Sequence, residues 1–177
     1  GTALSFLPKE DVFQGTRGRL EIVQHALFDV GAALATPRRH SDARKLKKTL
    51  FGPEATDLLE KWMDEMDVEL PQLKKFILPG GSPAGATLHL GRSIVRRAER
   101  SVLPLYEEQE VHQDVLVYLN RLSDYLFFAA RFVNHHVKIT PDEFIEPDFC
   151  SFRICVMCSS CSMHGLTQPN HAKADVW

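Results

Sequence analysis

The segment from Leu88 to Leu105 concentrates basic side chains on one predicted helix. Arg92, Arg96 and Arg100 follow one another at four-residue spacing, with Glu99 as the one acid of the segment. Residues four apart lie on one side of a helix. Because guanidinium groups stay charged and bind phosphate oxygens in pairs, this side could hold a polyphosphate. A solvated face with intrahelical ion pairs has the same pattern, and on the pattern alone that second interpretation is favoured.

A second polar group follows in the stretch "YLNRLSDYLFFAAR". Asn120 and Asp124 are four residues apart, and Arg121 and Arg131 flank them. Asn and Asp are poor residues for the interior of a helix unless they have a partner. Their position on one edge of an otherwise apolar helix indicates polar contacts with a neighbouring helix or subunit. A buried structural network is an equally good interpretation.

All four cysteines lie near the end of the chain, at Cys150, Cys155, Cys158 and Cys161. Thiols at this spacing could bind zinc or an iron–sulfur cluster, and His164 follows them. Reduced thiols in a loose tail are the favoured alternative, because the spacing does not match paired CxxC motifs. The absence of other cysteines argues against a disulfide-built secreted fold.

Composition limits the classes of protein that remain. The 177 residues carry a formal net charge of −2, with 44% hydrophobic and 25% charged residues, which is typical of a globular domain. The charge gives no general attraction to nucleic acid, and we expect neither a nucleic-acid nor a membrane partner. Walker loops, dinucleotide-binding fingerprints and nucleophile elbows are not found in the sequence.

Four segments with helical periodicity must position these side chains. Their apolar residues recur at alternating steps of three and four in the ranges 20–34, 59–70, 88–102 and 115–133. Ser82 and Pro83 form a typical cap and first-turn pair for the third helix. Short connections between such helices predict an all-α fold, an antiparallel helical bundle.

Three regions follow from this pattern. We expect an irregular lead-in over residues 1–19, the bundle over 20–135, and a divergent cysteine-containing tail over 136–177. Within the bundle, the basic stretch 38–48 is interpreted as a solvated loop and 76–85 as an apolar piece leading into a glycine-rich turn. In the tail, "TPDE" at 140–143 fits a capping box.

Four of these segments together resemble a known family. "LFDVGAALATP", "FILPGG", "GRSIVRRAER" and "YLNRLSDYLFFAAR", in this order, are similar to the trimeric, helical-bundle ATP:cob(I)alamin adenosyltransferases, which include the mitochondrial enzyme. The resemblance extends from about Leu20 to Val133. It implies a five-helix bundle with its first helix missing here, and a homotrimer with active sites between subunits.

The resemblance also implies an activity, transfer of the 5′-deoxyadenosyl group of ATP to cob(I)alamin with release of triphosphate. ATP with Mg²⁺ and cob(I)alamin are then the substrates, and a B12-dependent mutase is a possible recipient of the product. The mitochondrial matrix is the expected compartment, and otherwise the cytoplasm. The implied roles are catalysis for Arg92, Arg96 and Asp124, substrate binding for these three with Glu99, Arg100, Asn120 and Phe76, and contact with Mg²⁺ for Glu99.

Two family segments lack a match in the sequence. These are a "TKTGD"-like loop around the ATP phosphates and a first helix with a "DELN"-like segment, and residues 1–19 are not expected to replace them. We therefore expect weakened ATP binding. The alternative is a non-catalytic corrinoid-binding or structural bundle, with the cysteine tail as a metal site.

Overall fold

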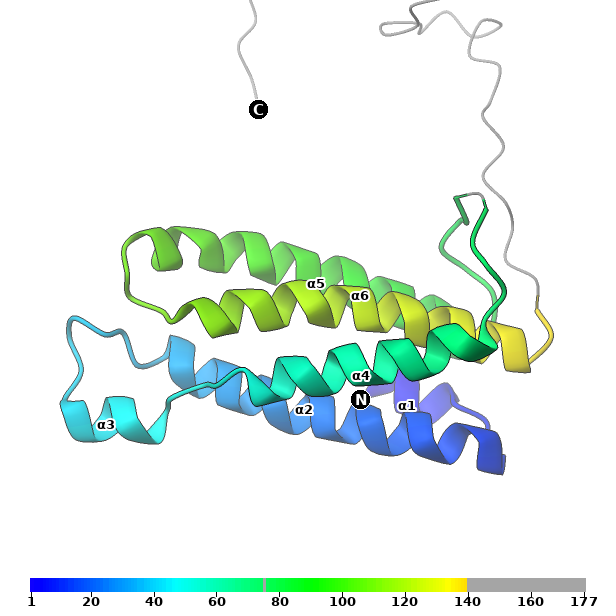
Figure 1. Ribbon diagram of the computed structural model, residues 1–177, viewed down its shortest axis with the longest axis horizontal. Helices are drawn as coiled ribbons and strands as arrows, with labels where there is room; N and C mark the ends of the chain where they lie inside the picture. Colours follow the sequence, from blue (N-terminus) through cyan, green and yellow to red (C-terminus); the bar gives the residue numbers. More distant parts are fainter. Residues whose placement is uncertain (75, 140–177) are drawn as a thin grey trace, which may run out of the picture. The chain divides into compact units, whose positions relative to one another are not determined.

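The computed structural model describes residues 1–74 and 76–139 of the chain. Every helix or strand element in these ranges is helical, which confirms the predicted all-α class. The elements are α1 (Thr2–Phe6), a 3-10 turn η1 (Asp11–Phe13), α2 (Gln14–Leu34), α3 (Ala43–Lys48), α4 (Glu54–Glu69), α5 (Pro83–Glu107) and α6 (Gln113–His136). The four long helices α2, α4, α5 and α6 alternate in direction along the chain and form the predicted bundle (Figure 1).

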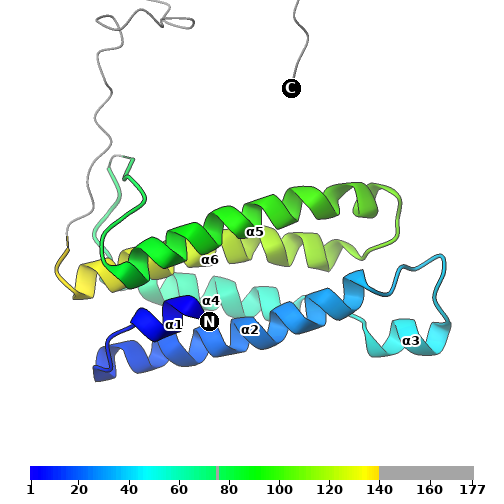
Figure 2. The same ribbon diagram turned by 180° about the vertical axis from the view of Figure 1, so that it is seen from behind.

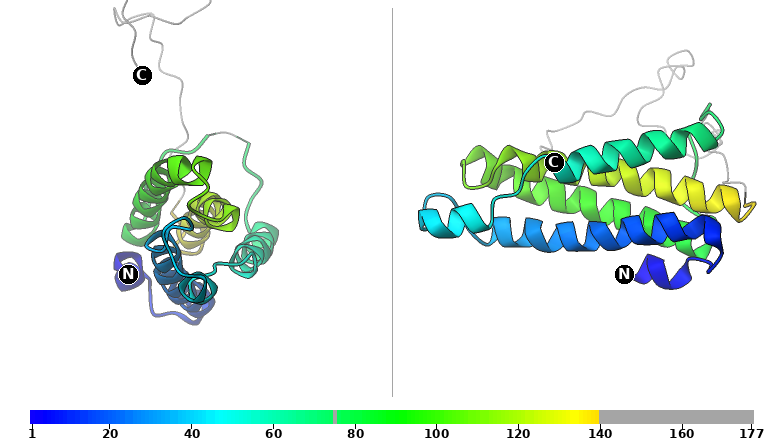
Figure 3. Two further views of the ribbon diagram at one scale, coloured as in Figure 1. Left: turned by 90° about the vertical axis from the view of Figure 1, so that its left-hand side faces the viewer. Right: turned by 60° about the horizontal axis from the view of Figure 1, so that its bottom comes forward.

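Helix α6 is the centre of the bundle, as the end-on view shows (Figure 3). It packs along both α5 and α4, and twelve of its residues are buried. The predicted apolar positions of α6 are all among them: Val115, Leu119, Leu122, Leu126, Ala129 and Val133. The ring of Tyr125 also meets that of Trp62 on α4, with 5.6 Å between centroids. A helix that is apolar around most of its circumference must be covered on most sides.

Helix α2 packs against α6 along a narrower face. Leu20, Val23 and Val30 are buried as predicted, whereas Leu27 is exposed. The guanidinium of Arg19 forms an ion pair with Glu65 and lies over the ring of Trp62, 5.7 Å from its centroid. This arginine therefore links α2 to α4 beside the apolar contact.

The prediction of an irregular lead-in over residues 1–19 is wrong. Residues 2–6 form α1, which packs against α5, and α2 begins at Gln14, so it extends the predicted helix by six residues (Figure 2). Arg17 fastens the lead-in to α2, because its guanidinium donates hydrogen bonds of 3.1 Å to the carbonyls of Leu4 and Leu7. Phe13 is buried and extends the apolar stripe of α2 toward the N-terminus.

The basic stretch 38–48 also differs from its prediction, because residues 43–48 form the helix α3 rather than a loop. Its exposure agrees with the prediction, since α3 has no buried residue. The connection before α3 is fixed from the loop between α5 and α6. There Glu110 is buried, and its carboxylate accepts a hydrogen bond of 3.0 Å from the backbone N–H of Arg39.

The start of α5 is as predicted. Ser82 is the N-cap, its hydroxyl accepts a hydrogen bond of 3.1 Å from Gly85 N–H, and Pro83 occupies the first turn. Pro104 lies inside the helix, which continues to Glu107. Within the described ranges, no helix is long and apolar enough to cross a membrane. The predicted capping box at 140–143 and the four cysteines lie outside the described residues.

Candidate functional site

Three of the predicted substrate-binding residues line one hollow on the bundle. Arg96, Glu99 and Arg100 of α5 surround it, and Leu103 and Leu116 complete its wall across the α5–α6 interface. Both guanidiniums are exposed, whereas Glu99 is half-buried. Two positive charges beside one carboxylate suit a polyphosphate that carries a divalent cation.

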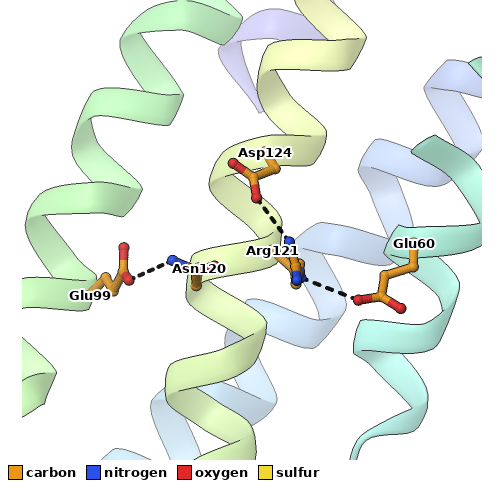
Figure 4. Close-up of polar contacts among 5 residues, drawn as sticks. All are labelled: Glu60, Glu99, Asn120, Arg121 and Asp124. Atoms are coloured by element: carbon orange, nitrogen blue, oxygen red, sulfur yellow. Dashed lines mark hydrogen bonds and ion pairs between the residues drawn. The ribbon is translucent and has the colours of Figure 1, made fainter. Parts of the chain in front are cut away.

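The orientation of Glu99 comes from α6. The side-chain amide of Asn120 donates a hydrogen bond of 2.9 Å to the Glu99 carboxylate, as Figure 4 shows. The two predicted polar residues of α6, Asn120 and Asp124, therefore have different partners. Asp124 is paired with Arg121 at 3.4 Å, and Arg121 also reaches Glu60 of α4 at 3.2 Å. Asn120 thus faces α5, while Arg121 connects Asp124 to α4.

Arg92 is placed apart from the hollow, one turn nearer to the start of α5. Its guanidinium lies over the ring of Phe127, 5.3 Å from the centroid, and its Nε is buried without a hydrogen-bond partner among the described residues. His89 approaches the same ring edge-on, with centroids 6.0 Å apart. Burial lowers the pKa of His89 from its ordinary value, and the neighbouring Arg92 lowers it further.

Phe127 is a residue of this region that the sequence interpretation missed. Asp124, Phe127 and Arg131 are spaced at three and four residues, so they share one edge of α6. The guanidinium of Arg131 lies 5.9 Å from the centroid of the Phe127 ring. That spacing was the available signal, although in the sequence Phe127 looks like any core aromatic.

Phe76 lies on the connection between α4 and α5, and its side chain is 83% exposed. An apolar ring of this size in water is a candidate contact for a large apolar ligand. The backbone before and after it is bonded to α6. Arg131 donates to the carbonyl of Pro71 at 2.7 Å, and Asn134, also missed in the sequence, holds Gly80 and Ser82.

The described residues contain no group of three or more His, Cys, Asp or Glu side chains that could hold a metal ion. Glu99 is thus a single carboxylate in its surroundings. One carboxylate suits Mg²⁺ that arrives with a nucleotide, because Mg²⁺ keeps waters and phosphate oxygens as its main ligands. The predicted cysteine site lies outside the described residues and remains a prediction.

Comparison with known proteins agrees with these features. The sequence profile described as cobalamin adenosyltransferase matches residues 1–133. A corrinoid adenosyltransferase of Bacillus subtilis is 45% identical over 134 residues, which are 76% of this chain and 66% of the relative. Corrinoid adenosyltransferase MMAB of Mus musculus is 47% identical over 113 residues, which are 64% of this chain and 48% of that protein. The chain therefore spans about two thirds of the bacterial relative and about half of the mammalian one.

A solved structure gives the same result for the fold. A variant of the PduO-type ATP:corrinoid adenosyltransferase from Lactobacillus reuteri, complexed with cobalamin and ATP, superposes with a TM-score of 0.70 at 38% identity. The match covers 80% of this chain and 76% of that chain. The match to the profile begins at residue 1 of the chain. The resemblance is therefore longer than the range from Leu20 that the motifs indicated. With 133 of its residues matched in this way, the chain belongs to the cobalamin adenosyltransferase family.

Proposed function

We propose that this protein transfers the 5′-deoxyadenosyl group of ATP to cob(I)alamin, giving adenosylcobalamin and triphosphate. In this step the electron pair of Co(I) attacks the C5′ carbon of the ribose and forms the Co–C bond. The C5′–O bond breaks, and the leaving triphosphate takes its electron pair. Negative charge therefore grows on the triphosphate oxygen, and this is the charge that the protein must stabilise.

Arg96 and Arg100 are the groups proposed to stabilise that charge. Both point from α5 at the hollow beside Glu99, and their exposure leaves the guanidiniums free to reach a phosphate chain. Positive charges that contact the phosphate chain lower the barrier because they stabilise the negative charge that develops on it. This pair of arginines in one hollow is the observation that carries the proposal.

Glu99 is proposed to contact the Mg²⁺ that accompanies ATP. The hydrogen bond from Asn120 holds one carboxylate oxygen and leaves the other for a cation or its waters. Asp124 stays a predicted catalytic residue, whose carboxylate is oriented by the ion pair with Arg121. These two acids therefore have separate tasks on α5 and α6.

Arg92 and Phe76 lie outside the hollow, and both are proposed to contact substrate there. The buried Nε of Arg92, which has no hydrogen-bond partner within residues 1–74 and 76–139, provides a donor for an acceptor brought by substrate or by a neighbouring subunit. The exposed ring of Phe76 is proposed to press on the lower face of the corrinoid and keep its axial base away. A corrinoid without this axial ligand is easier to reduce to the Co(I) nucleophile.

Calorimetric titration with MgATP and with cobalamin, followed by an assay of adenosylcobalamin formation, tests the proposal. Binding of both ligands with turnover supports it. Cobalamin binding without ATP binding and without turnover would instead favour the non-catalytic corrinoid-binding bundle. Arg96→Gln and Arg100→Gln should each weaken MgATP binding if the hollow is the phosphate site.

We further propose a homotrimer, a location in the mitochondrial matrix and delivery of the product to a B12-dependent mutase, as the family resemblance implies. Leu90 and Ile94 support an assembly, because these two apolar residues of α5 lie one turn apart and are 61% and 48% exposed. Light scattering of the purified chain would report a mass three times 20.0 kDa if the trimer forms. Cell fractionation tests the compartment.

A further inference from the structure

The segment that joins α4 to α5 carries one aromatic ring, and this ring has little contact with the rest of the protein. Residues 71–74 and 76–82 belong to no helix, and Phe76 at their centre is 83% exposed. A ring that contacts little protein is not located by its own packing. Its position therefore depends on how the two ends of the segment are fixed.

Both ends are fixed by one face of α6. Arg131 and Asn134 are three residues apart and so lie on the same side of the helix. The Arg131 guanidinium donates a hydrogen bond of 2.7 Å to the carbonyl of Pro71, where the segment begins. Asn134 is bonded where the segment ends: its Nδ2 donates to the Gly80 carbonyl at 3.0 Å, and its Oδ1 accepts from Ser82 N–H at 3.0 Å.

Asn134 is built into this turn. It is only 3% exposed, and its Oδ1 also accepts a hydrogen bond of 2.9 Å from the Ser82 hydroxyl, the same hydroxyl that caps α5. Gly81 and Gly85 make room for it, because a Cβ atom at either position would overlap the Asn134 amide. Gly81 in addition has a φ of +96°, which favours glycine. The amide thus uses its oxygen twice and its nitrogen once, and it joins the loop, the cap of α5 and α6.

We infer that Asn134 is a positioning residue for the corrinoid step: from α6 it fixes the end of the 71–82 segment and thereby the place of Phe76, with Arg131 as the second anchor. The inference rests on the proposed function of Phe76. It assigns Asn134 no contact with ATP, since the phosphate hollow is lined by other residues of α5 and α6. Loss of the Asn134 hydrogen bonds should therefore reduce the formation of four-coordinate corrinoid and leave MgATP affinity unchanged.

The test compares Asn134→Ala with Asn134→Asp in the complete chain. Aspartate keeps both acceptor bonds from Ser82 but replaces the donor to Gly80 with an acceptor oxygen, while a negative charge beside the start of α5 is favourable. Glu110→Ala is the matched control, because Glu110 is also buried and also holds a neighbouring loop. It belongs to the α5–α6 connection, which lies at the opposite end of the bundle from the α4–α5 connection (Figure 1). The readouts are hydrogen exchange of the amides of residues 76–78 and 80–82, MgATP affinity, and the paramagnetic resonance signal of four-coordinate cob(II)alamin formed with ATP.

The expected result is that Asn134→Ala raises exchange at these amides about tenfold and lowers the four-coordinate signal about tenfold, with MgATP affinity within about twofold. Asn134→Asp should stay within about threefold of the unmodified chain for both readouts. The inference fails if Asn134→Ala leaves exchange and signal unchanged, or if Glu110→Ala lowers the signal as much.

Two further outcomes are kept separate. If the unmodified chain gives neither turnover nor the four-coordinate signal, the proposed function fails, and the exchange data alone decide whether Asn134 fixes the loop. If Asn134→Ala does not fold, Arg131→Gln decides, because Arg131 is bonded at the exposed end of the segment. Unchanged exchange and signal in Arg131→Gln would then overturn the inference.

Discussion

The amide of Asn120 on α6 donates a 2.9 Å hydrogen bond to the carboxylate of Glu99 on α5. The two residues are 21 positions apart and meet only because α5 and α6 pack antiparallel along their lengths. The bond restricts the rotation of a carboxylate that stands beside Arg96 and Arg100. A ligand group held in this way reaches a cation with little loss of side-chain entropy.

Replacing Asn120 with Ala should therefore reduce kcat/KM for MgATP by about 10- to 100-fold, the usual range for a lost partner of a metal-binding group. The free energy of unfolding should change by less than about 0.5 kcal/mol, because Asn120 is exposed. Steady-state kinetics and urea unfolding measure the two quantities. Gln113→Ala, at an exposed position at the start of α6, is the control and should change neither.

Arg96 and Arg97 are adjacent, exposed arginines on α5, and only the first lines the hollow. Arg96→Gln should lower the rate of adenosyl transfer by about 10²- to 10³-fold, as expected for loss of one group that stabilises a leaving anion. Arg97→Gln removes the same charge one residue away and should keep the rate within about threefold. Equal losses in the two variants would show that general charge, and not the hollow, is responsible.

The sequence was sufficient for the elements with long periodic patterns. The stripe of α6 is buried at every predicted position, and the Ser82–Pro83 start of α5 is where it was expected. Both signals are local: a stripe repeats over several turns, and a cap depends on a few neighbouring backbone groups. Such features need no knowledge of the partner helix.

Short elements could not be predicted in the same way. Helix α1 has five residues and α3 has six, so neither repeats its pattern often enough to give a stripe. The charged composition of α3 is that of a solvated loop, and α1 depends on packing against α5 and on hydrogen bonds from Arg17. Their conformation is set by tertiary contacts that the local sequence does not contain.

The candidate site was predictable as a set of residues but not as an arrangement. Arg96, Glu99 and Arg100 were found from their spacing. The contact of Arg92 with Phe127 and the bonds that Ser82 donates to Asn134, in contrast, connect α5 and its N-cap to α6. Helical periodicity shows which residues share a face, but the register between two helices depends on side-chain interdigitation along the interface. These contacts became visible only in the folded chain.

Phe76→Ala should separate stability from activity. The ring is 83% exposed, so its removal should change the free energy of unfolding by less than about 0.5 kcal/mol. Turnover that starts from cob(II)alamin should fall by at least about tenfold, because reduction then competes with the axial ligand. Turnover from chemically prepared cob(I)alamin should fall less. Undiminished cob(II)alamin-dependent turnover would remove Phe76 from the proposed mechanism.

The pH dependence of stability provides a test of the region around Arg92. Burial, and then Arg92, lower the pKa of His89 below its ordinary value of 6.5. Between the folded and the unfolded pKa, the unfolded chain binds more protons at this side chain, so stability falls as the pH drops below about 6.5 and levels off below the folded pKa.

His89→Gln cannot titrate and should therefore lose less stability than the unmodified chain over this range. Urea unfolding at intervals from pH 5 to pH 8 measures the difference, in which the remaining histidines cancel because both proteins contain them. Parallel stability curves for the two proteins would show that His89 is not held neutral by its burial beside Arg92.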